Sequence, residues 1–571
     1  MQREPAIAFD LERWRRRVRV AQGREPADLV LTGGAVVDVF SEETIGAEVA
    51  IVDGVIAGVG DYPDGRERLD VSGRFVAPAF IDAHIHTESA LVWITEFARA
   101  VVPRGTGAIV TDPHEIANVA GLPGLQAMRE AAASLPLAVF FTAPSCVPAS
   151  AMESPGALFG PNEIAATLAW PETVGLGELM NFPGVLAGDD DIARKLAVSY
   201  GRRRDGHAPG LNGAALQAYA GSGPGSDHES TALAEARDKL RAGMIVMIRE
   251  GSSARNLAAL LPLVTDHTYP RCCFCSDDRD CDLLLHRGHM DDIVRQAIAG
   301  GLDPLRAIRL ATWNAADYWR LDGLGAVAPG FRANLAILDD LRSVAVGLTL
   351  HDGRVVARDG QLTTPLAGAD IPAWLRETMR PAPLAVEALR LPPDEARQAV
   401  VVAPGQIATG WEAIEPTVRD GWAVADPTRD LLKLVCVERH HATGRVGVGY
   451  VRSFGLRRGA LASSIAHDAH NIIAVGADDA DLLTAIEAVA ATDGGLAAVA
   501  DGEVLAQLPL PVAAILSDRP LPEVAARYAE LEGAARSLGS ELPSPFGLLS
   551  FLALSVIPQA RVTDRGFARL A

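Results

Sequence analysis

Histidine and acidic side chains stand at the ends of apolar, strand-like stretches of this sequence. The five groups are Asp82-Ala-His84-Ile-His86, Glu178, His207, Asp227-His228-Glu229 and Ser276-Asp277-Asp278. Successive side chains of a strand point to opposite faces of the sheet, so His84 and His86 point the same way. Imidazoles and carboxylates that meet in one space suit a pair of divalent cations.

A parallel barrel would bring these groups together. In a (β/α)8 barrel the chemistry collects where strands end and the βα-loops begin. An isolated loop histidine is more often a hydrogen-bonded residue than a metal ligand, but six candidates at strand ends favour a metal site. The predicted ligands of two ions are His84, His86, Glu178, His207, His228 and Asp277.

The stretch that spans residues 77–324 alternates between strand-like and helical patterns and is predicted to form that barrel. Its first strand is expected to include residues 75–81, which are apolar on both faces, as in a buried parallel sheet. Eight strands are predicted, and the fifth, just before His207, has the weakest pattern. Helices are expected over 124–134 and 290–299, among others.

The rest of the chain divides into flanking parts. Its 571 residues predict about three or four domains. Short β segments with Gly-Gly and Asp-Gly turns occur on both sides of the barrel and are expected to build one split β-domain. The fold class is therefore α/β, a (β/α)8 metallo-barrel inserted in a small split β-domain, with a further α/β domain. The predicted ranges are 1–24 for an N-terminal helix, 25–76 and 325–365 for the split β-domain, 366–385 for a linker and 386–571 for the C-terminal α/β domain.

Composition excludes several classes of protein. Apolar residues make up 49% and charged residues 22%, which is ordinary for a soluble enzyme. The net charge of −20 opposes nucleic-acid binding, so a nucleobase substrate should arrive free. We find no apolar stretch that could span a bilayer and no cleavable leader, and we expect a cytoplasmic protein without membrane contact.

Four of the six cysteines cluster, at positions 272, 273, 275 and 281. They lack the paired C-x-x-C spacing of a structural zinc site. We expect buried free thiols.

The predicted cluster can carry out hydrolysis. Two divalent ions that share a carboxylate lower the pKa of a bound water enough to supply hydroxide near neutral pH. Glu178 is the expected bridging carboxylate. Asp277 is the expected partner of the nucleophile, first as a general base and then as an acid. The mixed histidine and carboxylate ligands suit Mn, Fe or Zn rather than Ca.

The order of these ligands inside a split β-domain resembles the amidohydrolase superfamily. Five segments look more closely like the microbial adenine deaminases of that superfamily, and the similarity runs over nearly the whole chain. They are Asp82-Ala-His-Ile-His-Thr-Glu-Ser89, Thr111-Asp-Pro-His-Glu-Ile-Ala-Asn118, Gly206-His-Ala-Pro-Gly210, Ser226-Asp-His-Glu-Ser230 and His467-Asp-Ala-His-Asn471.

This resemblance implies hydrolytic deamination of free adenine, a small purine base, to hypoxanthine and ammonia. It implies two divalent ions, associated in this family with manganese or iron, with zinc as a possibility. Glu178 takes the place that a carboxylated lysine has in many relatives. Hydroxide from the metal pair would attack C6 of the purine, with Asp277 as the proton shuttle.

The resemblance leaves two roles open. The ring nitrogen of the purine needs a proton, for which Glu115 and His289 are the candidates, with a supporting role as the alternative for each. The segment 467–471 could reach an active site, bind another ion or lock a turn, and we favour the turn.

Other functions are compatible with the same cluster. The enzyme could act on another aminopurine or on a cyclic amide, since pocket residues decide the substrate. A purine-binding protein without turnover is the alternative outside enzymes, although no predicted ligand is missing. A symmetric homo-oligomer is the usual expectation for such a chain.

Overall fold

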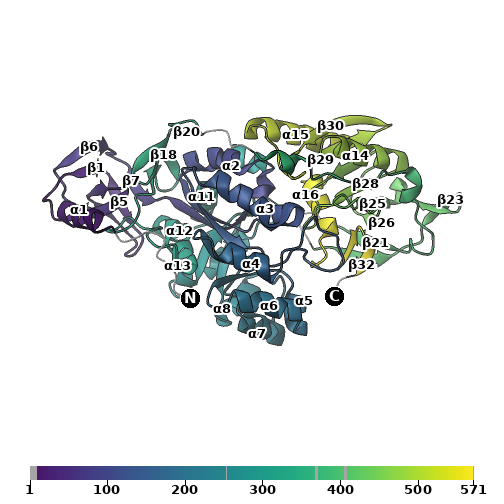
Figure 1. The fold of residues 1–571 in the computed structure, drawn as a ribbon, viewed down its shortest axis with the longest axis horizontal. Coiled ribbons are helices and arrows are strands. Elements are labelled where there is room, and N and C mark those ends of the chain that lie inside the picture. Colours follow the sequence, from purple (N-terminus) through teal and green to yellow (C-terminus); the bar gives the residue numbers. More distant parts are fainter. Residues whose placement is uncertain (1–9, 253, 367–370, 404–407, 558, 570–571) are drawn as a thin grey trace.

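The computed structural model describes residues 10–252, 254–366, 371–403, 408–557 and 559–569. The molecule is elongated: a β-domain lies at one end, the barrel in the middle and the C-terminal domain at the other end (Figure 1). Residues 1–9 of the predicted N-terminal helix and 367–370 of the predicted linker lie outside the described residues. The described part of that first segment contains α1 (Leu11–Ala21), capped by Asp10.

The β-domain consists of two sheets. One has the order β5-β4-β1-β6, and the other β20-β19-β18-β17-β7-β2-β3. Strands from both sides of the barrel meet in the second sheet, where Leu335 of β17 pairs with Pro78 of β7. The strands are β1 (Ala27–Thr32), β2 (Ala35–Asp38), β3 (Glu43–Gly46), β4 (Glu48–Val52), β5 (Val55–Gly60), β6 (Gly65–Asp70), β7 (Phe75–Pro78), β17 (Leu335–Asp340), β18 (Ala345–His351), β19 (Arg354–Arg358) and β20 (Gln361–Leu362).

The expected strand over 75–81 is two strands. β7 belongs to the β-domain, and β8 (Phe80–His86) is the first barrel strand. Between them the backbone N–H of Ala79 donates to Asn334 in the β-domain, and that of Phe80 donates to Gly105 at the barrel. Hydropathy alone did not reveal the change of sheet, because both strands are buried.

The barrel strands run parallel in two hydrogen-bonded groups, β12-β11-β10-β9-β8-β16 and β13-β14-β15. Pairing of β16 with β8 closes one seam, and the N–H of Gly225 donates to the carbonyl of Arg204 across the other. The strands are β9 (Thr106–Thr111), β10 (Ala138–Ala143), β11 (Thr173–Leu179), β12 (Arg203–Gly206), β13 (Ser226–Asp227), β14 (Ile245–Arg249), β15 (Cys272–Cys275) and β16 (Asp277–Asp278).

Helices cover the outside of the barrel (Figure 1). α3 starts ten residues before the predicted helix. It bends at Gly121, which has a φ of 61° and lies two residues before Pro123. The helices are α2 (Ile94–Val101), α3 (His114–Ala132), α4 (Pro161–Leu168), α5 (Phe182–Ala187), α6 (Asp190–Val198), α7 (Gly213–Ser222), α8 (Leu233–Arg241), α9 (Leu257–Leu260), α10 (Cys281–His286), α11 (Met290–Ala299), α12 (Pro304–Leu310) and α13 (Trp313–Trp319), with short 3-10 turns at Thr87–Ala90, Val102–Arg104, Leu261–Leu263 and Tyr269–Arg271.

The C-terminal domain is built on one largely antiparallel sheet of order β22-β21-β26-β25-β28-β27-β29-β30. Its strands are β21 (Gln398–Val401), β22 (Gly410–Ala413), β25 (Leu432–Val437), β26 (Val446–Arg452), β27 (Ala460–Ser463), β28 (Ile472–Gly476), β29 (Gly495–Ala500) and β30 (Glu503–Pro509). The other elements are the hairpins β23 (Thr417–Arg419) with β24 (Trp422–Val424) and β31 (Ala560–Thr563) with β32 (Gly566–Arg569), the helices α14 (Asp479–Ala491), α15 (Leu521–Ser537) and α16 (Pro545–Ser550), and 3-10 turns at Ala373–Arg376, Val386–Leu389, Pro427–Arg429 and Phe551–Ala553.

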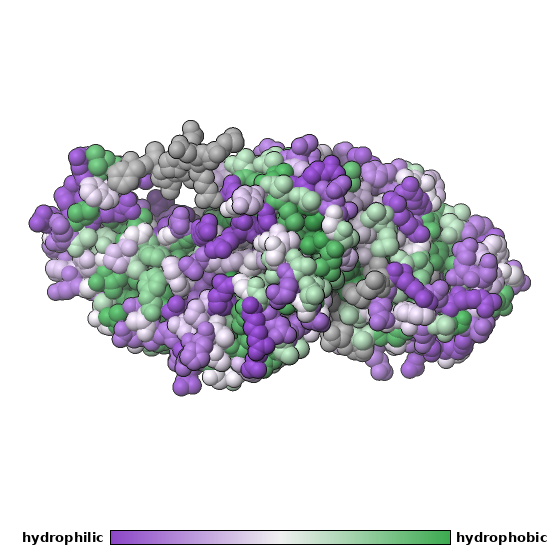
Figure 2. Space-filling model, turned by 90° about the horizontal axis from the view of Figure 1, so that it is seen from below, coloured by the Kyte–Doolittle hydropathy of each residue, from purple (hydrophilic) through white to green (hydrophobic). Residues whose placement is uncertain are grey.

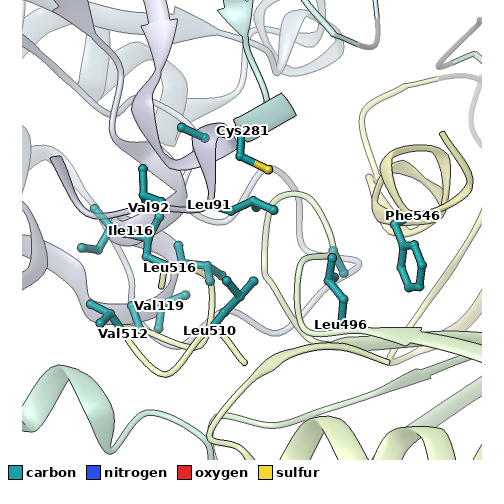
Figure 3. Close-up of a cluster of buried hydrophobic side chains, with 14 of the residues drawn as sticks. Leu91, Val92, Ile116, Val119, Cys281, Leu496, Leu510, Val512, Leu516 and Phe546 are labelled. Atoms are coloured by element: carbon teal, nitrogen blue, oxygen red, sulfur yellow. The ribbon is translucent and has the colours of Figure 1, made fainter. Parts of the chain in front are cut away.

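Barrel and C-terminal domain share one apolar core. Leu91, Val92 and Ile116 of the barrel belong to the same buried cluster as Leu510 and Leu516 of the C-terminal domain (Figure 3). The backbone joins them too, because Ser517 N–H donates to the carbonyl of Leu91 at 2.8 Å. The two parts are therefore packed as a single body rather than tethered by a linker.

The surface is polar at both ends of the molecule, and apolar side chains gather near the middle of the face seen in Figure 2. Within the described residues, no helix is both long and apolar enough to cross a membrane. All six cysteines are buried and free, which confirms the prediction for the four that cluster in the sequence.

Candidate metal centre

All six predicted ligands meet at the carboxyl end of the barrel strands. His84 and His86 end β8, Glu178 ends β11, His207 and His228 follow β12 and β13, and Asp277 begins β16. Each side chain is buried. His86 Nε2 lies 3.1 Å from Glu178 Oε1, and His84 Nε2 lies 3.1 Å from Asp277 Oδ1. On the far side, Glu178 Oε2 lies 2.5 Å from His207 Nδ1 and 3.2 Å from His228 Nε2.

Hydrogen bonds behind the first two histidines orient their rings. His84 Nδ1 lies 2.7 Å from the carboxylate of Asp205, and His86 Nδ1 lies 2.8 Å from the carbonyl of Asp112. Both acceptors place the proton on Nδ1, so each Nε2 lone pair points toward the centre of the cluster. The two Nε2 atoms are only 3.1 Å apart.

This donor set fits divalent cations. Neither ring nitrogen of the fully buried His228 makes a hydrogen bond among the described residues. Imidazole lone pairs and carboxylate oxygens that face one another in a buried space repel, and a cation between them would offset this repulsion. Two groups of three ligands share Glu178: His84 and His86 complete the first, and His207 and His228 the second. One carboxylate oxygen of Glu178 faces the first group and the other oxygen faces the second.

Asp277 is held in its ionised form. Burial by itself raises the pKa of this carboxyl, but the charge of Arg249, with contributions from the neighbouring His84 and His86, brings the pKa well below its usual range. Arg249 Nη2 lies 2.5 Å from Asp277 Oδ2. The backbone of Asp277 has a positive φ of 57°, uncommon outside glycine, which re-aims the side chain where the strand ends.

The two candidates for the second acid differ in position. Glu115, near the start of α3, lines the cavity above the cluster. His289 lies elsewhere: its Nδ1 is 2.9 Å from Thr106 Oγ1, and its Nε2 is 2.9 Å from Asp82 Oδ2. His289 lines neither of the two cavities described below and contacts Asp82 instead.

Several residues near the cluster were not assigned from the sequence. His114 Nδ1 lies 3.6 Å from Glu178 Oε1, and its Nε2 lies 3.6 Å from Asp468 Oδ1 of the C-terminal domain. His114 belongs to the segment Thr111–Asn118, which contributed to the resemblance but not to the chemistry. The sequence could have indicated Arg249 as a site residue, because it is a charged residue at the end of an otherwise apolar strand.

A small cavity lies over the cluster. Phe551, Leu554 and Ile557 line it from the C-terminal domain, together with His467 and Asp468. Residues 467–470 form a turn, and His467 and Asp468 within it also line the cavity, so the role of this segment stays a prediction. A second, larger cavity shares Glu115, Asp278, His467 and Phe551 with the first.

Comparison with known proteins covers both halves of the chain. The profile of the Amidohydrolase family matches residues 75–368, and that of the Adenine deaminase C-terminal domain matches residues 406–571. "Adenine deaminase" from Dehalococcoides mccartyi is 47% identical over 551 residues, 96% of each chain. "Adenine deaminase" from Methanothrix thermoacetophila is 44% identical over 96% of each chain. "Adenine deaminase" from Syntrophobacter fumaroxidans is 44% identical over 98% of this chain and 97% of its own.

Proposed function

Because this chain belongs to the amidohydrolase family, and within it to the adenine deaminases, we infer that it hydrolyses free adenine to hypoxanthine and ammonia. The observation that carries this function is the match to relatives of that name over nearly the full length, together with a complete cluster of candidate ligands. That completeness argues against a purine-binding protein without turnover. The net charge of −20 favours a free base over a nucleic acid.

Two divalent ions, manganese or iron and otherwise zinc, would be held by His84, His86, Glu178, His207, His228 and Asp277. The support is the pair of three-ligand groups that share Glu178. When bound, such ions make water a strong nucleophile near neutral pH and polarise the group under attack. Ligand type does not choose among these metals, so metal analysis of the purified protein has to do so.

Asp277 is proposed to move the proton of the reaction. Because its carboxyl is ionised, Asp277 can accept a proton of the attacking water and then pass that proton to the amino group at C6. The C–N bond breaks, ammonia leaves, and the second proton of the water ends on the adjacent ring nitrogen of hypoxanthine. Of the two candidates that could serve this ring nitrogen, only Glu115 lines the cavity, and there His467 lowers the pKa of Glu115 and keeps its carboxyl ionised.

The proposal is tested by measuring adenine conversion and metal content in the same sample. Protein loaded with Mn or Fe should convert adenine to hypoxanthine and contain about two ions per chain. Asp277→Asn and Glu178→Gln should lose turnover by several orders of magnitude. Asp282→Asn, at a half-exposed carboxylate five residues further on, serves as the control and should keep full activity.

Robust turnover by the Asp277→Asn protein with both ions in place would contradict the proton-shuttle assignment. Faster release of ammonia from another aminopurine, or ring opening of a cyclic amide, would instead identify that compound as the substrate. A place in purine salvage, a cytoplasmic location and a homo-oligomeric state stay predictions, to be checked by a salvage-dependent growth assay, cell fractionation and light scattering.

A further inference from the structure

His467 of the C-terminal domain stands at the junction of the two cavities. It lies between β27 and β28, and it lines both the cavity over the metal cluster and its larger neighbour. About 10% of its side chain is exposed, although the ring is otherwise enclosed. The C-terminal domain thereby places an imidazole beside the space where the substrate would lie.

Two contacts fix the ring of His467. Its Nδ1 lies 3.2 Å from Glu115 Oε1, an ion pair between the C-terminal domain and the barrel. Its face stacks on Phe551, with ring centroids 4.4 Å apart and planes inclined by 16°. A buried imidazole held at its edge and on its face has one orientation, which is what a positioned donor requires.

His470 lies on the other side of Glu115, with Nε2 at 3.9 Å from Oε2. The trio could suggest a third metal site, but the backbone argues against one. The N–H of Ala466 faces Nδ1 of His470 at 3.4 Å, so the neutral ring carries its proton on Nε2. That nitrogen thus presents an N–H to Glu115 and has no lone pair for a cation.

The charges of this trio are unequal. Burial lowers the pKa of His467, but the carboxylates of Glu115, Asp278 and Asp468 together raise the pKa above the usual value. Burial brings the pKa of His470 well below its usual range, so His470 is neutral. His467 is thus the charged imidazole of the pair. Its Nε2 has no hydrogen-bond partner among the described residues, and the ring borders the cavities.

We propose that His467 is a purine-binding residue that the C-terminal domain contributes, its Nε2–H donating to a ring nitrogen that carries no proton in adenine or hypoxanthine, such as N3, while Glu115 holds the imidazole ring. This inference rests on the proposed function. Purine ring nitrogens are acceptors, and proteins recognise free or flipped bases by hydrogen bonds of this kind. Attack at C6 pushes negative charge onto the ring, so a charged donor binds the transition state more tightly than the substrate.

Two amide variants test the two ring nitrogens of His467 separately. His467→Asn keeps a polar atom near Glu115, in the place of Nδ1, but has nothing in the place of Nε2. His467→Gln places an amide near the position of Nε2. Binding of hypoxanthine to the Mn-loaded full chain, measured by calorimetry, should weaken about 10- to 100-fold in the Asn variant, as expected for a lost bond to a charged donor. The Gln variant should stay within about threefold of the unmodified protein.

The kinetics should follow the same order. In His467→Asn, kcat for adenine should fall and KM should rise, because the bond strengthens toward the transition state. His441→Asn is the control: this histidine also contacts the barrel, through the carbonyl of Pro155 at 2.9 Å, but lines neither cavity. Metal content and thermal unfolding of each variant show whether it folds and keeps the cluster intact.

The inference is overturned if His467→Asn folds, retains its metal and binds hypoxanthine as tightly as the unmodified chain. It is equally overturned if the Gln and Asn variants are impaired alike. An unmodified, metal-loaded chain that does not deaminate adenine rejects the proposed function instead. In that case, purine binding that still depends on His467 would support the inference by itself.

Discussion

At the scale of single residues, charges behind the candidate ligands hold the ligand loops in place. Asp227 accepts hydrogen bonds from the N–H of Ala208 at 3.1 Å and from Ser230, and so ties together the loops that carry His207 and His228. The fully buried Lys239 lies 2.8 Å from Asp227 and neutralises it. This ion pair is structural, yet it fixes the position of two predicted ligands.

Removing the lysine should therefore be costly. Lys239→Met leaves the carboxylate of Asp227 buried without its counter-charge, and the free energy of unfolding should fall by about 3–5 kcal/mol. Urea unfolding near neutral pH measures this free energy. Lys195→Met is the matched control, since its partner Asp191 is 53% exposed and stays hydrated. A loss under about 1 kcal/mol for Lys239→Met, equal to that of the control, would refute this account.

Residue types at strand ends predicted much of the cluster. The alternation within β8 placed His84 and His86 on one face, and the strand-end positions brought the other four candidates to the same edge. His289 was different, since it also follows the last barrel strands but turns toward Asp82. A side chain's direction after a strand depends on the loop that follows, and sequence spacing does not contain that information.

At the scale of elements, α15 packs across the junction of barrel and C-terminal domain. Its buried side chains recur every three or four residues, at Leu521, Val524, Tyr528 and Leu531. Glu532 lies at the margin of this apolar face, 3.9 Å from Arg536. Burial raises the pKa of Glu532 to about 7, so the folded chain favours the neutral carboxyl.

The sign of the pH effect follows from this shift. Below the ordinary pKa of 4.5 the carboxyl is neutral in both states and has no effect. As the pH rises to about 7, the unfolded chain ionises first and is favoured, so stability is lost over this window. Glu532→Gln should therefore raise the free energy of unfolding by about 2 kcal/mol at pH 8 and change it little at pH 4.

Thermal unfolding at the two pH values checks this prediction. Glu530→Gln, on the exposed side of the same helix, is the control and should show no such difference. Equal stabilisation of the Glu532→Gln protein at both pH values would mean that side-chain packing, not ionisation, explains the change.

Periodicity predicted elements best where an element buries one face against a single neighbour and leaves the other face exposed. The helix expected over 290–299 matches α11, whose apolar residues face the barrel and whose first turn carries two aspartates. It failed where neighbouring elements are both buried. The stretch 75–81 divides between two sheets, and the first turns of α3 were not expected, because the sequence 114–120 contributes to the site as well as to packing.

At the scale of the whole molecule, the interface between barrel and C-terminal domain is part of the core. Leu516 is 1% exposed and packs in the same cluster as Val92 and Ile116 of the barrel. Figure 3 shows these side chains from both parts turned toward one another. Such an interface couples the unfolding of the two parts, since neither can expose its side without exposing the other.

Leu516→Ala should lower the stability of the entire chain. The lost burial and the remaining cavity predict about 2–5 kcal/mol, with both parts losing structure at a lower temperature. Calorimetry and tryptophan fluorescence together report whether the transitions coincide. Leu505→Ala, at a side chain 44% exposed on β30, should change stability by less than about 0.5 kcal/mol. A C-terminal transition that shifts while the barrel transition stays would contradict a shared core.

The sequence by itself determined the alternation of strands and helices, the histidine and acidic candidate ligands near the strand ends, and the family. These depend on local periodicity and on residue type at element boundaries. Only the tertiary structure decided which side chains of the C-terminal domain face the cavity, and that His467 meets Glu115 across the interface. The physical reason is that this contact joins positions about 350 residues apart through the packing of two domains, which leaves no pattern along the chain.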